Sequence, residues 1–466
     1  MEKYTGTIIE ALRKSDYKSQ LKKSYDYSIA YLDSLSEIPV FPKEENIKAL
    51  EIFDENMPND PTDTDEILKL LKDYGSRATV SQTGGRYFGF VVGGNMTPVL
   101  ATRWLTEAWD QNSAMYVHSP ITSKLEEISE KWINQLLGFP EETAIGFVTG
   151  SSLAIMCGLA AGRNCLLKRM GWDVVKKGLY GAPKLKIIAS EEVHSTDVKM
   201  LSVLGLGQEN IITVPTDDNG SMRMDLLPEM DNRTILILQA GNLHSGSFDD
   251  FKTACDKAHK AGAWVHVDGA IGLWARANDE MKHLTKGLEL ADSYNTDGHK
   301  TLNMTYDIGL VLCKNKEALI EAMHMTGDYI ILSNDRDNMM YTPEMSRRAR
   351  GVDMWACLKA LGKAGVKELV KELHEKAKYF AKELENNGFE ILNEVVFNQI
   401  SVYYINDEAT NDLANRLQHS GILWLGASKW KGKSIIRISL SNYMTTYDDI
   451  DICVAEFKKQ GQKIAY

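Results

Sequence analysis

Asp268 and Lys300 are the residues of this 466-residue chain whose types and surroundings most clearly predict chemistry. Asp268 ends the apolar run AWVHVD and is followed by the small residues Gly269 and Ala270. Lys300 lies further along, in the loop TDGHKTLN. A carboxylate can hold a proton on a ring nitrogen, and a lysine amine can form an imine with an aldehyde carbon. The two residues therefore have the chemistry needed to hold an aromatic aldehyde cofactor.

Pyridoxal 5'-phosphate is the cofactor that this pair predicts. A carboxylate beside the pyridine nitrogen makes the ring an electron sink, and Ala270 leaves room for the flat ring against the backbone. Taken singly, Asp268 could be a helix cap and Lys300 a solvated lysine. The occurrence of both, in HVDGA and DGHK, favours the cofactor site.

A phosphate group also has a predicted cradle. The strand-like run IGFVT leads into Gly150, Ser151 and Ser152, and a helix-like stretch follows over 151–169. Backbone amides at a helix start bind phosphate, two hydroxyls add donors, and glycine allows close approach. The alternative is a serine that caps the helix.

Two further polar residues follow predicted strands. His194, in EEVHSTD, could stack on the cofactor face opposite Ala270, although most histidines are ordinary surface or core residues. Asn242, in QAGNLHSG, could donate to the phenolic oxygen of the cofactor or to a substrate carboxylate. Both are placed by their order along the chain, because ligands of such sheets lie beyond the carboxyl ends of the strands.

Short apolar segments alternate with helix-like stretches through the middle of the chain. This order predicts an α/β fold with a mainly parallel sheet and helices on both faces. The predicted strands are 145–149, 185–189, 210–215, 234–239, 264–268 and 308–313, and helices between them include 151–169 and 249–262.

The order of elements changes near both ends. Residues 5–35 have helical periodicity and 54–65 form an acidic, turn-rich connector, which predicts a helical arm over 1–80. A large domain is predicted over 81–350. A long helical stretch and two more strand-like runs then predict a small α/β domain over 351–466.

Composition limits the partners and the compartment. The formal charge of −11 argues against nucleic acid and anionic membrane as partners. No apolar run approaches the roughly 18 residues that span a bilayer, and no signal peptide is recognisable. The six cysteines lack metal-ligand spacing, so no metal site is expected and free thiols in a reducing cytoplasm are predicted.

The order of motifs resembles the group II pyridoxal-phosphate-dependent amino-acid decarboxylases. The motifs are TGSS, EEVHS, QAGNLHSGSFD, HVDGA, DGHK and MSRRARGVDMWACLKALG. The resemblance implies fold type I, the aspartate-aminotransferase-like fold with a seven-stranded type of sheet, and a homodimer. It also implies that Lys300 is the Schiff-base lysine, Asp268 the pyridinium partner and His194 the stacking residue, with His299 near the phosphate held by Ser151 and Ser152.

Three positions depart from the family pattern. Many relatives have Gly-Gly-Ser/Thr-Glu-Ala-Asn at the cradle, where this chain has Gly150-Ser151-Ser152-Leu-Ala-Ile. Many also have threonine at the position of Asn242. The tyrosine of the family's mobile loop, expected within 328–345, falls on Asn338 in an ungapped register, with Tyr341 three residues away.

The resemblance implies decarboxylation of an L-amino acid to its amine, with Tyr341 or His194 protonating Cα. An aminotransferase stays open because Arg437 could clamp an α-carboxylate, although a strand arginine paired with an acidic neighbour is the favoured interpretation. An aldehyde-forming decarboxylase and a carbon–carbon lyase acting on a phospho-amine are further alternatives. A catalytically silent, metabolite-binding relative is the alternative from another class.

The substrate pocket is predicted from two stretches that match pocket-lining segments of the family. They contain Phe88, Asn95 and His118, whose side chains could equally belong to the core. Gly93 and Gly94 would leave space for a bulky side chain, which favours an aromatic over an acidic substrate.

Overall fold

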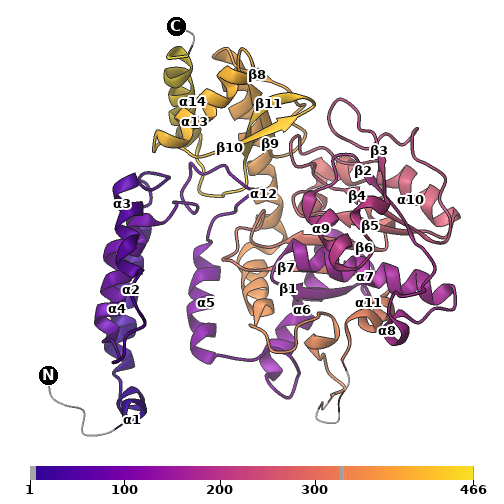
Figure 1. Cartoon of the computed structure of the whole chain (residues 1–466), viewed down its shortest axis with the longest axis horizontal. Helices are drawn as coiled ribbons and strands as arrows, with labels where there is room; N and C mark the ends of the chain where they lie inside the picture. The colour runs from indigo at the N-terminus through magenta and orange to yellow at the C-terminus, as the bar shows by residue number, and fades with distance from the viewer. Residues whose placement is uncertain (1–6, 326, 328–329, 331, 465–466) are drawn as a thin grey trace. The chain divides into compact units, whose positions relative to one another are not determined.

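Seven strands form one sheet in the order β1-β7-β6-β5-β4-β2-β3 (Figure 1). The computed structural model describes residues 7–325, 327, 330 and 332–464. β7 is antiparallel to both β1 and β6, and the other pairs are parallel. The predicted, mainly parallel sheet is therefore confirmed. Its strands are β1 (Ala144–Val148), β2 (Lys186–Ser190), β3 (Ile211–Val214), β4 (Thr234–Gln239), β5 (Trp264–Asp268), β6 (Ser293–Asp297) and β7 (Gly309–Cys313).

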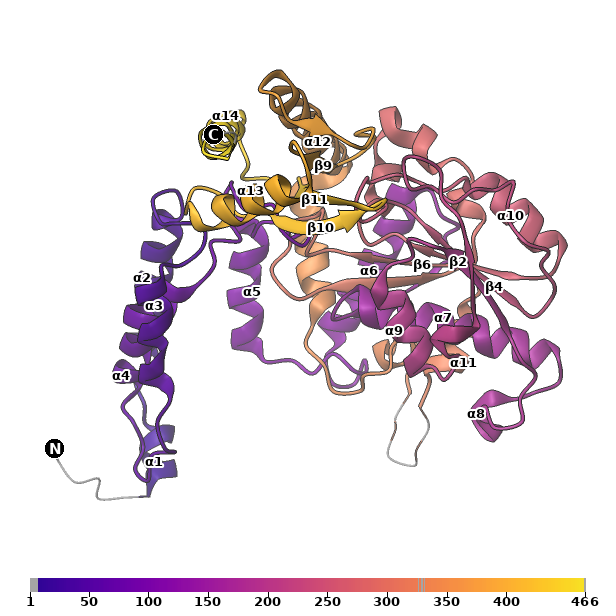
Figure 2. The ribbon, with the colours of Figure 1, turned by 45° about the horizontal axis from the view of Figure 1, so that its top comes forward.

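Both faces of this sheet are covered by helices because consecutive residues of most strands are apolar and their side chains point alternately to the two faces. In β2, Ile187 and Ala189 join one hydrophobic cluster, while Ile188 points to the other face and joins a second. Figure 2 shows the helices on the two sides of the strands. The first cluster includes residues of α7 (Ser151–Arg169), α9 (Ser195–Val203) and α11 (Lys316–Met323); the second includes residues of α6 (Pro120–Leu137), α10 (Phe251–Lys260) and α12 (Arg350–Asn386).

Helix α7 approaches the sheet closely through two glycines. A Cβ atom on Gly158 would lie 2.7 Å from the His266 ring, and one on Gly162 would lie 2.7 Å from the Trp264 ring. Both rings are buried side chains of β5. The glycines therefore set the distance between this helix and the strand that ends at Asp268.

Strand β6 is absent from the predicted strands, although all five of its residues are buried. Its sequence, SYNTD, is mostly polar, so the apolar signal that marks the other strands is missing. It pairs with β5 on one side and β7 on the other.

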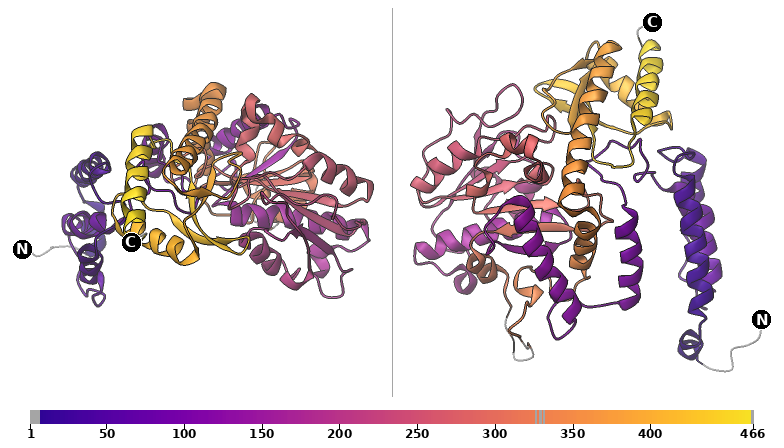
Figure 3. Two further views of the ribbon diagram at one scale, coloured as in Figure 1. Left: turned by 90° about the horizontal axis from the view of Figure 1, so that it is seen from above. Right: turned by 180° about the vertical axis from the view of Figure 1, so that it is seen from behind.

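A smaller, antiparallel sheet has the order β10-β11-β9-β8. Its strands are β8 (Glu390–Ile391), β9 (Gln399–Tyr403), β10 (Gly426–Trp430) and β11 (Lys433–Ser439). The long helix α12 contacts both sheets (Figure 3). Its two parts meet at Gly362, whose φ of 60° breaks the helical path.

Contacts divide the chain into two compact units. Residues 88–411 and 426–443 contain both sheets, and this unit also includes α5 (Thr97–Trp109) and α8 (Val174–Lys177). The predicted domain boundaries at residues 80 and 350 stay a prediction. No helix among the described residues is both long enough and apolar enough to cross a membrane.

The second unit comprises residues 1–87, 412–425 and 444–466. Its helices are α1 (Ile8–Arg13), α2 (Tyr17–Ser34), α3 (Glu44–Lys48), α4 (Thr64–Leu70) and α14 (Tyr447–Gln462), while α13 (Asp407–His419) crosses the boundary between the units. The predicted helical stretch over 5–35 is two helices, because Asp16 caps a new helix with hydrogen bonds from Lys18 N and Ser19 N. Within this unit, Tyr87 stacks on Trp424 at 5.2 Å.

The close approach of α7 gives a prediction for Gly162→Ala. Alanine usually stabilises a helix interior relative to glycine by about 0.5–1 kcal/mol. Here the new methyl group would press on the Trp264 ring, so we expect a net loss of about 1–3 kcal/mol in the free energy of unfolding. Urea denaturation followed by circular dichroism measures it, and unchanged or higher stability would show that the contact does not limit the packing.

Candidate active site

The adjacent strands β5 and β6 bring the predicted carboxylate and lysine to one edge of the sheet. Asp268, the last residue of β5, is paired in register with Asn295 of β6. Lys300 follows the end of β6, and its Nζ lies 3.0 Å from Oδ2 of Asp297. The side chain of Lys300 is 19% exposed, whereas that of Asp297 is 1% exposed. The amine is therefore reachable from outside while its counter-charge is buried.

Asp297 joins the lysine to the start of helix α7. Its Oδ1 accepts a hydrogen bond from Ser151 N, and its Oδ2 accepts one from Ser151 Oγ, both at 2.7 Å. His299 Nε2 lies 3.7 Å from Oδ1. Burial raises the pKa of Asp297, but Lys300, His299 and the Ser151 hydrogen bond outweigh it and hold the pKa below its usual value. This carboxylate is therefore ionised at neutral pH.

Asp268 is held by donors on one of its oxygens. Its Oδ1 accepts hydrogen bonds from Asn295 Nδ2 at 2.7 Å and from Ala270 N at 3.1 Å. Asn295 Oδ1 in turn lies 3.1 Å from Nε2 of His266. Burial lowers the pKa of His266 to about 4, so this ring is neutral and can donate to Asn295. A chain of hydrogen bonds thus runs from the sheet interior to Asp268.

His194 belongs to the same electrostatic environment. It caps α9, and its Nδ1 accepts a hydrogen bond from Thr196 N at 3.2 Å. A neutral imidazole that accepts at Nδ1 carries its proton on Nε2. Burial lowers the pKa of His194, and the charges of Asp268 and Lys300 act on it in opposite directions. The charges of both predicted cofactor ligands therefore influence the pKa of the His194 imidazole.

The predicted phosphate cradle is only partly free to bind. Gly150 precedes α7 in an extended conformation, and a Cβ atom there would lie 3.3 Å from Cε1 of His299. Ser151 donates both its amide and its hydroxyl to Asp297, whereas Ser152 is exposed at the helix start. Ser152 is thus the more available of the two hydroxyls.

Asn242 and His299 make specific contacts of their own. Asn242 Nδ2 donates to Glu192 Oε2 at 2.9 Å, and its Oδ1 accepts from His244 N at 2.8 Å. The first bond joins the loop after β4 to the segment after β2, and the second lies within the loop after β4. The His299 ring stacks on Tyr306 at 4.3 Å, and its Nδ1 accepts from Ile308 N. Their predicted roles in cofactor binding stay predictions.

The predicted substrate residues differ in exposure and in contacts, and their role stays a prediction. Phe88 is 1% exposed and packs edge-on against Phe380. Asn95 Oδ1 accepts from Thr305 Oγ1 at 2.6 Å, and His118 is exposed. The backbone carbonyls of His299 and Lys300 occupy the side of Gly93 where a Cβ would project.

The glycines therefore serve packing, and the expected space for a bulky substrate is not found beside them. Gly94 is likewise covered, by Asn303, Asn442 and Tyr443. A glycine at position 93 lets the backbone after β6 approach closely, which helps to fix the start of the Lys300 loop. The substrate preference inferred from Gly93 and Gly94 has no support in this geometry.

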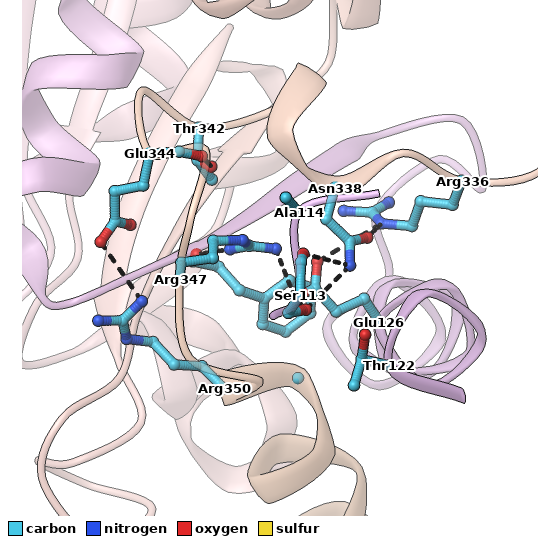
Figure 4. A network of polar contacts seen from close by, with 12 residues as sticks. Ser113, Ala114, Thr122, Glu126, Arg336, Asn338, Thr342, Glu344, Arg347 and Arg350 are labelled. Atoms are coloured by element: carbon cyan, nitrogen blue, oxygen red, sulfur yellow. Dashed lines mark hydrogen bonds and ion pairs between the residues drawn. The ribbon is translucent and has the colours of Figure 1, made fainter. Parts of the chain in front are cut away.

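The predicted mobile loop, 328–345, is firmly attached along its described part. Residues 328, 329 and 331 lie outside the described residues. Arg336 donates to Glu130 Oε2 at 2.7 Å and to the backbone oxygen of Ile145. Asn338 Nδ2 donates to Ser113 O at 3.1 Å (Figure 4). The fully buried Arg347 pairs with Glu126 at 2.5 Å just beyond the loop.

Tyr341 is part of this attachment. It is 7% exposed and belongs to the hydrophobic cluster of α7 and α11. The Arg336 guanidinium lies 4.1 Å from its ring centre, and Lys316 Nζ lies 5.6 Å away. The contacts described for Tyr341 thus involve neither Lys300 nor Asp268. Its predicted role as proton donor stays a prediction.

The sequence reasoning missed Asn295 and Asp297. Both lie on β6, whose polar sequence hid the strand. A signal was present, since Asn295 lies two residues before Asp297, the first residue of the DGHK motif. Polar residues two apart at a strand end point to one face of the sheet.

The comparisons with known proteins decide the family. Residues 46–405 match the family described as "Pyridoxal-dependent decarboxylase conserved domain". The chain belongs to this family. It is thus a pyridoxal-phosphate-dependent carboxy-lyase that acts on an amino acid, as the motifs predict.

Relatives of this decarboxylase include enzymes named for different substrates. Acidic amino acid decarboxylase GADL1 of Mus musculus is 25% identical over 88% of this chain and 80% of its own length. Aromatic-L-amino-acid decarboxylase of Bacillus atrophaeus is 23% identical, covering 98% and 96%. The crystal structure of Oryza sativa TDC with PLP and tryptamine has a TM-score of 0.88 at 21% identity, covering 97% and 98%, and confirms the predicted fold.

The residues at the sheet edge fit pyridoxal phosphate. Lys300 offers a reachable amine, and Asp268 offers a carboxylate whose described hydrogen bonds all end on Oδ1. The start of α7 offers Ser152 and a glycine that keeps the approach open. These groups match the aldehyde, the ring nitrogen and the phosphate in chemical type.

The lowered pKa of Asp297 gives a prediction for Asp297→Asn. A carboxylate with a depressed folded-state pKa stabilises the fold above its unfolded pKa of about 3.9, and this stabilisation is lost as the pH falls through the folded pKa. We expect the cofactor-free variant to be less stable than the parent by about 1–3 kcal/mol near pH 7. The difference should shrink below about pH 4, as measured by urea denaturation across pH.

Asp249→Asn is a matched control with the opposite sign. Burial raises the pKa of Asp249 to about 6, and its oxygens accept from Met222 N and Gln239 N. The parent should therefore gain stability relative to this control as the pH falls from about 6 to 4. A pH-independent difference for Asp297→Asn would contradict the ionised pair with Lys300.

Proposed function

We propose that the carboxyl edge of β5 and β6 is the cofactor site of this amino-acid decarboxylase. Lys300 Nζ would bind the aldehyde carbon, Asp268 would hold a proton on the ring nitrogen, and the start of α7 would hold the phosphate. The observation that carries this proposal is the Lys300–Asp297 pair on the strand next to Asp268.

Asp268 and Asp297 have different roles in the proposed reaction. When bound, pyridoxal phosphate supplies an aldehyde carbon for the substrate amine and a protonated ring that accepts the electron pair left by CO2. Asp268 keeps the proton on the ring nitrogen, and its bonds from Asn295 and Ala270 fix the carboxylate in place. Asp297 gives the Lys300 ammonium a counter-charge when the substrate has displaced it.

His194 is the proton donor to Cα that the geometry supports better. Its Nε2 proton is available because Nδ1 accepts from Thr196, and its ring is close enough to Lys300 and Asp268 to be influenced by both charges. Tyr341 instead packs beneath Arg336. A positioned donor protects the carbanion from interception by oxygen or another carbon.

We also propose a cytoplasmic homodimer. Helix α5 exposes Leu105 and Trp109 at 55% and 40%, and these residues, four apart, share one face of the helix. Exposed apolar side chains on one helix face commonly form part of a protein interface. Support for the compartment comes from the six cysteines, all of which are free thiols.

The assignment of Asp268 predicts the effect of Asp268→Asn. Without the carboxylate, the ring nitrogen loses its proton more readily, so amine formation should slow by several powers of ten while cofactor still binds. The parent enzyme is incubated with each of the twenty amino acids and its products are identified by mass, and the variant is assayed on the best substrate. Near-native turnover would make Asp268 a structural residue, and keto acid or aldehyde as the main parent product would contradict amine formation.

The proton donor is tested with His194→Gln and Tyr341→Phe. Loss of a positioned proton donor typically lowers a rate by about 10²-fold or more. We expect His194→Gln to lower amine output to that extent and to raise the share of aldehyde, with Tyr341→Phe as the control that keeps the parent product ratio. The reverse pattern would assign the donor to Tyr341.

Assembly is tested by sedimentation velocity of the holoenzyme. We expect a dimer for the parent and a larger monomer fraction for Leu105→Glu, because a buried charge opposes an apolar interface. A parent that sediments as an active monomer would contradict the proposed dimer.

A further inference from the structure

Asp197 is a buried carboxyl group for which the mechanism above has no use. It lies in the first turn of α9, three residues after the cap His194, and its relative exposure is 0%. Neither Oδ1 nor Oδ2 has a hydrogen-bond partner among the described residues. Burial of an ionised carboxylate without partners is strongly unfavourable. The side chain must therefore be protonated or share a proton with a neighbouring carboxylate.

A second acceptor, the Asp268 carboxylate, lies next to Asp197. Asp268 lies within side-chain hydrogen-bonding range of Asp197. Two ionised carboxylates cannot occupy such a distance in a buried site, so they share a proton. A single shared proton would form a hydrogen bond between one oxygen of each residue, which explains why two acceptors lie next to each other here.

The surroundings decide which residue carries the proton. Asp268 receives hydrogen bonds from Asn295 Nδ2 and Ala270 N, whereas no donor from another described residue reaches the Asp197 carboxyl oxygens. Burial, and then the proximity of Asp268, raise the pKa of Asp197 well above its usual value, and Lys300 opposes this only in part. The proton therefore resides on Asp197.

We propose that Asp197 is a positioning residue of the cofactor site, whose protonated carboxyl group donates a hydrogen bond to Asp268. This inference rests on the proposed role of Asp268 as the partner of the cofactor ring nitrogen. Both described donors to Asp268 end on Oδ1, so the bond from Asp197 adds a restraint from another element, helix α9.

The consequence is a carboxylate that is fixed in orientation and remains singly charged. A neutral donor stabilises the negative charge of Asp268 without adding a second charge beside the cationic ring. The same helical turn carries His194, so one short segment would place both the imidazole and the donor to Asp268. A shift of α9 would disturb both together.

A structural alternative assigns Asp197 to the helix alone. An ionised acid in the first turn of a helix interacts favourably with the helix dipole, and Asp197 N does bond to His194 O at 2.9 Å. In that case its effect on the cofactor would not depend on Asp268. The two accounts therefore differ in whether the two aspartates are energetically coupled.

A double-mutant cycle measures this coupling. The four proteins are the parent, Asp197→Leu, Asp268→Asn and the double variant, and the readout is the dissociation constant for pyridoxal phosphate from the visible absorbance of the titrated protein. We expect Asp197→Leu to weaken binding by about tenfold or more in the parent background. In the Asp268→Asn background it should change binding by less than about threefold.

Asp197→Asn is the conservative control, because its amide can donate to Asp268 without a titratable proton. We expect binding within about threefold of the parent. A tenfold loss in Asp197→Asn, or an equal loss from Asp197→Leu in both backgrounds, would overturn the proposal. Asp197→Ala replaces Asp197→Leu in the cycle if the larger side chain prevents folding, which thermal denaturation of each variant monitors.

The cycle also distinguishes a failure of the proposed role of Asp197 from a failure of the proposed role of Asp268. If Asp268→Asn leaves both the visible spectrum and the turnover of the parent unchanged, the proposed role of Asp268 fails. If Asp268→Asn acts as expected but Asp197→Leu binds the cofactor as the parent does, only the role of Asp197 fails.

Discussion

The ion pair between Lys300 and the buried Asp297 is the interaction on which the site depends. A carboxylate with 1% of its side chain exposed is tolerable only when its charge is balanced and its oxygens accept hydrogen bonds. Lys300 supplies the balancing charge, and Ser151 supplies donors from the start of α7. The pair thus ties the end of β6, the lysine loop and a helix start into one unit.

The sheet around this pair explains why the other groups lie where they do. Asp268 stands beside Asn295 because β5 and β6 are parallel neighbours in register. Asn295 can bond to Asp268 because its own oxygen is satisfied by His266 from inside the sheet. Glycines at positions 93 and 158 let the lysine backbone and helix α7 approach closely. Hydrogen bonds to buried polar groups and close packing at glycines therefore both stabilise this edge of the sheet.

Much of the fold could be predicted because apolar periodicity is strong where strands are buried on both faces. The segments 234–239 and 264–268 coincide with β4 and β5, and 151–169 coincides with α7. Asp268 and Lys300 were found because their motifs combine a strand end with a reactive residue type. β6 was missed because a polar strand carries no such pattern, and Asn295 and Asp297 were missed with it.

Contacts between segments far apart in the sequence could not be predicted from local patterns. The attachment of the 332–345 segment depends on Arg336 reaching Glu130 and on Asn338 reaching Ser113, which no spacing rule reveals. The meeting of Asp197 with Asp268 is of the same kind, since it requires the packing of α9 against the sheet. The prediction of free space beside Gly93 was wrong for the same reason, because the backbone of residues 299 and 300 fills that space.

Covalent attachment of the cofactor to Lys300 can be tested by peptide mapping after borohydride reduction. Reduction of the holoenzyme makes the bond between lysine and cofactor permanent, and mass spectrometry of the digest locates the labelled residue. We expect a pyridoxyl label on Lys300 and loss of that label in Lys300→Ala. A label on any other lysine of the parent holoenzyme would contradict it.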